Sequence, residues 1–154
     1  MKNLITTDNI LSYTDTYTPI QDLDLNYNSQ IITPNKESFI FTESKETARY
    51  LSESLEKIYP GKVIRYDGDS SAAEKKQVIN NFDANAPRKE NEYRILIATE
   101  VLAEGVNLHR SNVVINYDIP WNPTRLMQRV GRVNRIDTEF EKIYTFNFFT
   151  HHSF

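Results

Sequence analysis

The chain has 154 residues, of which 39% are hydrophobic and 25% are charged, and this composition is typical of one globular domain with a core. A formal net charge of −3 excludes a basic surface over the whole domain, so any nucleic-acid surface has to be local. The absence of cysteine excludes disulfides and thiolate metal sites, and we expect no metal site. Because no apolar run approaches membrane-spanning length, we expect a cytoplasmic protein without a membrane partner.

Residues 1–37 differ in composition from the rest of the chain. They are rich in Thr, Asn, Asp and Tyr, their apolar residues are scattered, and Pro19 and Pro34 interrupt them. We predict an irregular lead-in or linker here, followed by one regular domain at residues 38–154.

The regular domain begins with an apolar run at residues 39–42 that predicts a buried strand. Ser44 is placed to cap the following helix, and Pro60 and Gly61 predict where that helix ends. Its buried face is predicted from apolar residues at helical spacing: Ala48, Leu51, Leu55 and Ile58. A second strand is predicted at residues 63–66, with a turn at Asp67 and Gly68.

A second helix is predicted after the capping-box pair Ser71 and Glu74, with Val78, Ile79 and Phe82 on its buried face. A polar loop at residues 85–92 then leads to a central strand at residues 93–98. The remaining elements are predicted to be a helical turn at 100–104 and strands at 113–117 and 143–149. Strands that alternate with helices predict an α/β fold, with a mainly parallel sheet covered by helices on both faces.

Polar residues follow each of the predicted strands. They occur at residues 42–44, 66–68 and 99–100 and at Asp118. In an open parallel sheet, ligands bind beyond the carboxyl ends of the strands, which favours a functional edge here. Ordinary turn chemistry is the alternative, and we prefer it for Asp67 and Gly68 taken alone.

The segment of residues 116–137 carries four arginines around one glycine, Gly131: Arg125, Arg129, Arg132 and Arg135. Asn122 and Pro123 predict a helix start. On the helix that follows, Leu126, Val130 and Val133 are predicted to be buried, and Gln128, Arg132 and Arg135 lie on another face. A helical glycine costs about 1 kcal/mol relative to alanine, so Gly131 indicates a close backbone approach or a break in the helix.

Four arginines and no lysine favour a site that binds phosphate through bidentate hydrogen bonds. A solvated basic face is the alternative. Residues 128–135 resemble motif VI of superfamily 2 helicases and translocases, and residues 118–125 resemble SWI/SNF-type DNA translocases, especially bacterial RapA-like proteins. This resemblance implies the C-terminal one of two RecA-like lobes. It implies that Arg132 and Arg135 are catalytic and reach the γ-phosphate of ATP held on the first lobe, with Gln128 and Arg129 also at the nucleotide.

Three further segments resemble motifs of the same superfamily in the family's order. Residues 95–108 resemble motif V, which implies that Thr99 contacts the nucleic-acid backbone and that Gly105 and Asn107 line the ribose side of ATP. Residues 39–55 resemble motif IV, which implies that Thr42 and Ser44 face a phosphate backbone. The segment around Gly68, with Ser71 and Lys75, resembles the next motif and adds Gly68 to the nucleic-acid contacts.

No two of the four glycines have the spacing of a P-loop. We therefore expect the chain to be the second lobe of an ATP-dependent helicase or DNA translocase, inactive alone, with ATP and Mg²⁺ held mainly by a missing first lobe. The expected partners are that N-terminal RecA-like lobe and nucleic acid, with duplex DNA preferred over RNA. The alternatives are a truncated, non-catalytic binding module, an RNA helicase lobe and an unrelated nucleotide-binding domain. Trp121 is predicted to lie in the core or at a lobe interface, with base stacking as the alternative.

Overall fold

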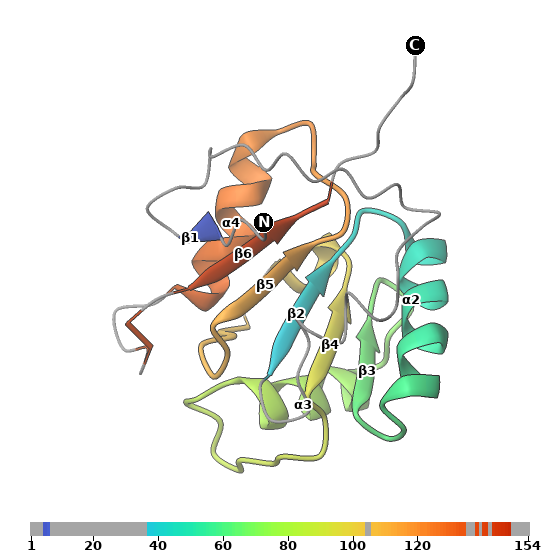
Figure 1. Ribbon diagram of the computed structural model, residues 1–154. Helices are drawn as coiled ribbons and strands as arrows, with labels where there is room; N and C mark the ends of the chain where they lie inside the picture. The colour runs from blue at the N-terminus through green and yellow to red at the C-terminus, as the bar shows by residue number, and fades with distance from the viewer. Residues whose placement is uncertain are drawn as a thin grey trace.

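The computed structural model describes residues 5–6, 37–103, 106–134, 138, 140, 141 and 143–148. Its centre is a six-stranded sheet of order β1-β6-β5-β2-β4-β3 (Figure 1). The strands are β1 (Ile5–Thr6), β2 (Ser38–Phe41), β3 (Val63–Tyr66), β4 (Ile95–Ala98), β5 (Val113–Asn116) and β6 (Tyr144–Asn147). The strands from β6 to β3 are parallel to their neighbours, and β1 pairs antiparallel with β6.

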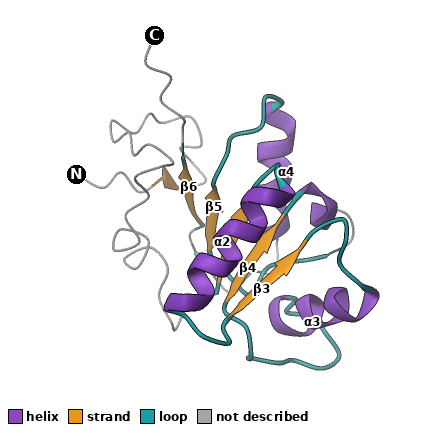
Figure 2. Cartoon of the chain, turned by 90° about the vertical axis from the view of Figure 1, so that its right-hand side faces the viewer, coloured by secondary structure: helices purple, strands orange, loops and turns teal. Residues whose placement is uncertain are grey.

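Helices cover both faces of this sheet, as the sequence predicts. Helix α2 (Lys45–Ile58) packs on one face, and α3 (Ala72–Phe82), the 3-10 helix η3 (Glu100–Ala103) and α4 (Pro123–Val133) pack on the other (Figure 2). Side chains that alternate along β2 divide between the two cores. Phe39 and Phe41 join the core under α3 and α4, whereas Ile40 joins the core under α2. The prediction of an α/β fold with a mainly parallel sheet is confirmed.

Helix α2 begins where the sequence predicts. The Ser44 hydroxyl accepts a hydrogen bond from the Thr47 N–H at 3.2 Å, which satisfies an amide that the helix itself leaves free. Three of the four residues in the predicted apolar stripe are buried: Ala48, Leu51 and Leu55. The prediction is wrong for Ile58, which is 38% exposed because the helix ends at this residue.

Helix α3 begins at the predicted capping box, in which the Ser71 hydroxyl accepts from the Glu74 N–H and the Glu74 carboxylate accepts from the Ser71 N–H. At its end lies Asn81, which is fully buried. The Asn81 Oδ1 accepts from the N–H groups of Glu92 and Tyr93 at 2.9 and 3.0 Å, and its Nδ2 donates to the Gln77 carbonyl at 2.8 Å. This amide fixes the end of the loop after α3, so β4 begins at Ile95 rather than at the predicted Tyr93.

The predicted lead-in contributes to the fold at two places that the structure describes. β1 extends the sheet beyond β6, with Ile5 opposite Thr145 and Thr6 opposite Tyr144. Glu37, immediately before β2, is buried and forms ion pairs with Arg94 at 3.4 Å and Arg110 at 3.1 Å. The other residues of the lead-in lie outside the described part of the chain. In that described part, no helix is long and apolar enough to cross a bilayer.

Candidate nucleotide and nucleic-acid site

Helix α4 carries the arginine segment and starts at the predicted cap. The Asn122 Oδ1 accepts from the Thr124 N–H at 2.9 Å, and Pro123 occupies the first turn. Val130 and Val133 are buried as predicted, whereas Leu126 is only half-buried. The structure therefore confirms the helix and most of its buried face, and it places the described arginines in three different environments.

Arg129 points into the lobe and is 1% exposed. Its Nε donates to Glu100 Oε1 at 2.8 Å, and its Nη1 donates to Asn116 Oδ1 at 3.2 Å and to the Asp118 carbonyl at 2.9 Å. Its Nη2 also donates to Glu100, and its guanidinium carbon lies 5.6 Å from the centre of the Phe41 ring. All three nitrogens thus have partners inside the lobe.

The predicted contact between Arg129 and the nucleotide is not supported by this geometry, because its guanidinium has partners within the lobe. A buried guanidinium has to be neutralised and hydrogen-bonded within the protein, and Glu100 and Asp118 supply the negative charge. Arg129 therefore joins α4 to the turn after β4 and to the end of β5.

Arg125 and Arg132 lie on the solvent side of α4. Arg125 pairs with Glu43 at 3.2 Å, and both side chains are exposed. Arg132, in the last turn, is half-buried, and its side chain makes no hydrogen bond or ion pair with any residue that the structure describes. Arg132 is thus a half-buried cation of the last turn of α4 that no described residue neutralises.

Asn107 and Gln128 lie near Arg132. The Leu108 N–H donates to the Arg132 carbonyl at 2.9 Å, which brings the loop containing Asn107 against the end of α4. Asn107 is half-buried, and Gln128 is exposed one helical turn before Arg132. Three of the predicted nucleotide-side residues are therefore brought together, while Gly105 and Arg135 lie outside the described residues.

Gly131 lies within α4, which continues to Val133, so the predicted break does not occur. A Cβ added at Gly131 would have no described atom within 4 Å. The glycine is exposed and no described part of the lobe requires it. The other prediction, a close approach of the backbone to something outside the lobe, remains open.

The predicted nucleic-acid contacts follow three adjacent strands. Thr42 follows β2, Thr99 follows β4 and Gly68 lies just after β3. The Thr42 N–H donates to the Ala98 carbonyl at 3.1 Å and the Thr99 N–H donates to the Tyr66 carbonyl at 3.2 Å, so the sheet's hydrogen bonding extends to this edge. As expected for a parallel sheet, the three residues lie together where the strands end at their carboxyl termini. We call this region the strand-end edge.

The Thr42 side chain faces inward at that edge. It is fully buried, and its hydroxyl donates to Asp118, whose carboxylate also accepts from the Glu43 N–H at 2.9 and 3.0 Å. The side-chain oxygen of Ser44 caps α2 and also donates to Glu46 at 2.9 Å. The prediction that these two hydroxyls face a phosphate is therefore not supported by the geometry, because each has a partner within the protein.

Asp118 is the residue of this edge to which sequence reasoning assigned no role. Its partners Thr42 and Glu43 lie 76 and 75 positions away along the chain. From the sequence, Asp118 is known only to follow a predicted strand, and that position alone does not identify its partners.

Thr99 and Gly68 are placed differently from Thr42. Thr99 is 5% exposed, and its hydroxyl has no hydrogen-bond partner among the described residues. Gly68 is exposed, and a Cβ there would lie 3.3 Å from the Lys45 Nζ. The Lys45 ammonium also pairs with Asp69 at 2.8 Å, and this hydrogen bond raises the pKa of Lys45 and lowers that of Asp69. The Gly68 backbone and Lys45 are therefore accessible at this edge, as are Glu43 and Asp69.

The parallel sheet, the strand-end edge and helix α4 with its arginines define a RecA-like α/β lobe of the superfamily 2 helicases. A model described as the helicase conserved C-terminal domain matches residues 23–137, which is more than half of the chain. The chain belongs to this family. The match begins inside the stretch predicted as a lead-in.

Relatives with known names support this assignment. The chain is 48% identical over 60 residues to a Bacillus subtilis protein named "Uncharacterized ATP-dependent helicase YqhH", covering 39% of this chain and 11% of that protein. It is 36% identical over 100 residues to "Probable ATP-dependent RNA helicase MJ0669" of Methanocaldococcus jannaschii, covering 64% and 25%. The chain thus spans a quarter or less of the length of these relatives.

Among solved structures, the C-terminal domain of the DEAD-box protein Dbp5 has a TM-score of 0.63 at 26% identity, covering 83% of this chain and 69% of that one. The C-terminal part of the Fun30 ATPase domain has a TM-score of 0.68 at 22% identity, covering 84% and 40%, and at that identity it shows the fold alone. The predicted resemblance to SWI/SNF-type, RapA-like proteins is not confirmed, because most of the similar proteins carry the names of RNA helicases.

Proposed function

We propose that this lobe completes an ATP site whose P-loop lies on a first RecA-like lobe, with Arg132 and Arg135 contacting the γ-phosphate. The observation that carries the proposal is the position of Arg132. It is the described arginine of α4 whose side chain has no partner among the described residues, whereas Arg125 pairs with Glu43 and Arg129 is buried. A guanidinium that is always charged and unneutralised suits a polyphosphate.

The neighbours of Arg132 fit the nucleotide. Asn107 supplies an amide that can hydrogen-bond a ribose hydroxyl, and Gln128 offers a second amide on the same side of α4. Arg132 would supply positive charge where negative charge accumulates during phosphoryl transfer, a contribution of about a thousandfold or more to the rate. Gly131 allows the ligand or the first lobe to approach the helix backbone closely.

Magnesium does not fit the described residues of this lobe. They contain no group of three or more His, Cys, Asp or Glu side chains that could hold a metal ion, and Glu100 and Asp118 are neutralised by Arg129. The Mg²⁺ that accompanies ATP would therefore be held by the first lobe and by the phosphates themselves.

The strand-end edge would contact the nucleic-acid backbone. The N-terminus of α2, Lys45 and the backbone at Gly68 lie there together, and helix N-termini and lysines are common phosphate contacts. Thr99 adds a buried hydroxyl that lacks a described partner. In this proposal Thr42 and Ser44 shape the edge, and the backbone of α2 rather than their hydroxyls faces the phosphate.

RNA is the nucleic acid to test first. MJ0669 and DbpA of Bacillus subtilis are named RNA helicases, and one similar structure is an S. cerevisiae Dbp5 variant bound to RNA and ADP BeF3. The preference for duplex DNA that we drew from residues 118–125 has no support from these relatives. A DNA translocase remains the second candidate because the segment from Asp118 to Arg125 resembles that group.

The test compares the chain alone with the same lobe joined to a P-loop lobe. The expected result is no ATP hydrolysis by the chain alone, and hydrolysis by the two-lobed protein that single-stranded RNA stimulates more than duplex DNA does. Clear turnover by the chain alone would overturn the two-lobe proposal. Stimulation by duplex DNA alone would instead favour the translocase, and no turnover in either form would favour a non-catalytic binding module.

A further inference from the structure

Strand β3 ends the described sheet, opposite the edge formed by β1. Its described neighbour is β4, toward which the carbonyls of Lys62 and Tyr66 point. The Lys62 carbonyl accepts from the Ile95 N–H at 3.0 Å, and the Tyr66 carbonyl accepts from the Thr99 N–H at 3.2 Å. Because alternate residues of a parallel strand bond to the same neighbour, the main-chain groups of Val63 and Arg65 face away from β4.

These outward groups are available for pairing. No described residue hydrogen-bonds the main-chain N–H or C=O of Val63 or Arg65. Both side chains are half-buried, and they alternate with the buried side chains of Ile64 and Tyr66. An unpaired strand of this kind is a ready template for an additional strand.

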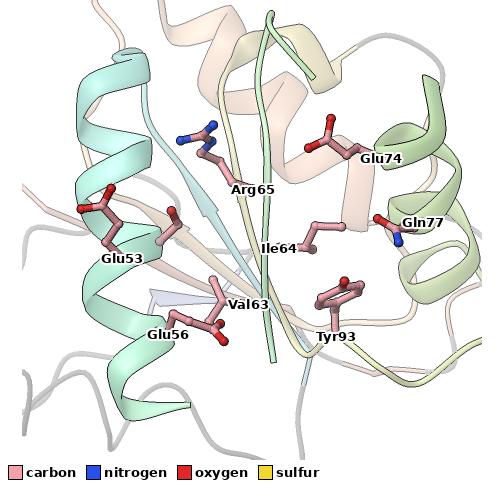
Figure 3. A pocket seen from close by; sticks show the side chains of 9 residues that line it. Glu53, Glu56, Val63, Ile64, Arg65, Glu74, Gln77 and Tyr93 are labelled. Atoms are coloured by element: carbon pink, nitrogen blue, oxygen red, sulfur yellow. The ribbon is translucent and has the colours of Figure 1, made fainter. Parts of the chain in front are cut away.

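An open groove of about 370 Å³ runs along the same strand. Figure 3 shows its walls: Glu53 and Glu56 come from α2 on one side, and Glu74 and Gln77 come from α3 on the other. Tyr93 lies on the α3 side, below Gln77 in this view. The groove therefore has room for side chains that project to either side of a strand added at β3.

The groove is negatively charged. Glu53, Glu56 and Glu74 contribute three carboxylates, while its cation, Arg65, pairs with Asp67 at 3.1 Å. Glu53 makes no hydrogen bond or ion pair with a described residue. Such a surface attracts lysine and arginine side chains and repels the phosphates of a nucleic acid.

We propose that the β3 edge binds an extended, lysine- or arginine-rich segment of a partner protein by strand addition. The main chain of the segment pairs with Val63 and Arg65. Basic side chains on one face of the segment meet Glu53 and Glu56, and those on the other face meet Glu74. This surface contains none of the residues assigned to the nucleotide or to the nucleic acid. The strand-addition proposal is therefore independent of the proposed function.

The test uses the full chain and a capped heptapeptide as the probe, in which pairs of lysines alternate with pairs of valines so that lysines lie on both faces of the extended peptide. We expect the amide resonances of Val63 and Arg65 to shift on titration, and their hydrogen exchange to slow by about tenfold or more at saturation. Two further versions of this peptide carry N-methyl groups, one on the odd-numbered and the other on the even-numbered backbone nitrogens. Only one of the two should bind, because alternate N–H groups of an added strand pair with β3 and the others point away from it. Amides of Val63 and Arg65 that are already protected without peptide would show that the edge is occupied, which would overturn the proposal.

Charge is tested separately from backbone pairing. Glu53→Lys should weaken the peptide by roughly two- to fivefold, as expected for one exposed ion pair converted to a repulsion. Glu141→Lys makes the same charge change at an exposed position before β6 and should leave the affinity unchanged. Equal weakening by both variants, or equal binding of the same peptide with glutamate in place of each lysine, would contradict the proposal. Far-UV circular dichroism confirms that each variant is folded.

Discussion

Arg129 and Glu100 connect two candidate contact regions of the lobe: the Arg129 Nε on α4 donates to Glu100 Oε1, after β4, at 2.8 Å. Arg129 is 1% exposed, so its charge has to be balanced inside the protein, by Glu100 and by Asp118 at 3.6 Å. The pair holds the helix that carries Arg132 against the strand-end edge that carries Thr99. The positions of the two candidate contact regions are therefore fixed relative to each other.

Replacing Arg129 should destabilise the lobe strongly. Arg129→Ala leaves Glu100, Asn116 and Asp118 without their buried partner, and loss of one member of a buried ion pair costs about 3–5 kcal/mol. Arg129→Lys should recover only part of this loss, because the single ammonium group of lysine cannot reproduce the hydrogen bonds of the planar guanidinium. Urea unfolding followed by circular dichroism measures the difference.

Arg88→Ala is the matched control for that prediction. The Arg88 side chain is 82% exposed and pairs only with Glu90 at 3.1 Å among the described residues. Its removal should change the unfolding free energy by less than about 0.5 kcal/mol. Equal effects of the two substitutions would show that Arg129 does not hold the lobe together.

The sequence was sufficient to predict α2 to α4 and β2 to β6, but not β1 or the partners of the buried polar groups. Periodicity and caps locate α2, α3 and α4 because they depend on neighbours within one turn, as at Ser44 and at Ser71 with Glu74. Arg129 lies three positions after Leu126 and four positions before Val133, so its burial is consistent with the helical pattern. Its partners, however, lie 11 to 29 positions away, and no local pattern identifies them.

The same limit explains the inward-facing Thr42. A polar residue after a buried strand predicts a functional edge, and Thr42 does lie at that edge. Its bond to Asp118 forms only because β5 lies beside β2 in the sheet. The order of the strands had to be known before the direction of that hydroxyl could be assigned.

Gly131→Ala should stabilise this lobe by itself. The added methyl group meets no described atom within 4 Å, and alanine in a helix is favoured over glycine by about 1 kcal/mol. Chemical denaturation should show a higher midpoint for the variant with an unchanged slope. In the two-lobed protein the same change should lower ATP turnover if the helix backbone is approached closely. A destabilised isolated lobe would show instead that a contact within this lobe requires the glycine.

The stability of the lobe should depend on pH through Glu37. Burial raises the pKa of Glu37 to about 7 from an ordinary 4.5, against the opposing effects of Arg110 and Arg94. A raised pKa in the folded state means that the stabilisation is complete below about pH 4.5 and is lost as the pH rises through about 7. At high pH the loss amounts to about 3 kcal/mol at most.

Glu37→Gln removes this titration. The variant should therefore gain stability relative to the parent chain between pH 5 and pH 8, measured by urea unfolding at the two values. A relative loss over this interval would mean that Arg110 and Arg94 hold Glu37 ionised and that the ion pairs outweigh the cost of burial.

The fluorescence of Trp121 can detect a ligand or a first lobe that binds near the start of α4. It is 100% exposed, so the predicted core position is wrong, and lobe contact or base stacking stays a prediction. Trp121→Ala should change the unfolding free energy by less than about 0.5 kcal/mol and weaken ligand binding by several fold. It is the single tryptophan of the chain, so quenching of its fluorescence by a first lobe or by single-stranded RNA distinguishes the two roles. No quenching by either ligand would exclude both.

The most direct test of the central claim measures ATP turnover by the two-lobed protein carrying Arg132→Ala, with Arg88→Ala as the control. If Arg132 contacts the γ-phosphate, kcat should fall by about a thousandfold or more, because charge stabilisation in the transition state is lost. The melting temperature should remain unchanged because Arg132 has no described side-chain partner. Turnover within about twofold of the Arg88→Ala control, in a folded variant, would contradict the assignment of Arg132 to the ATP site.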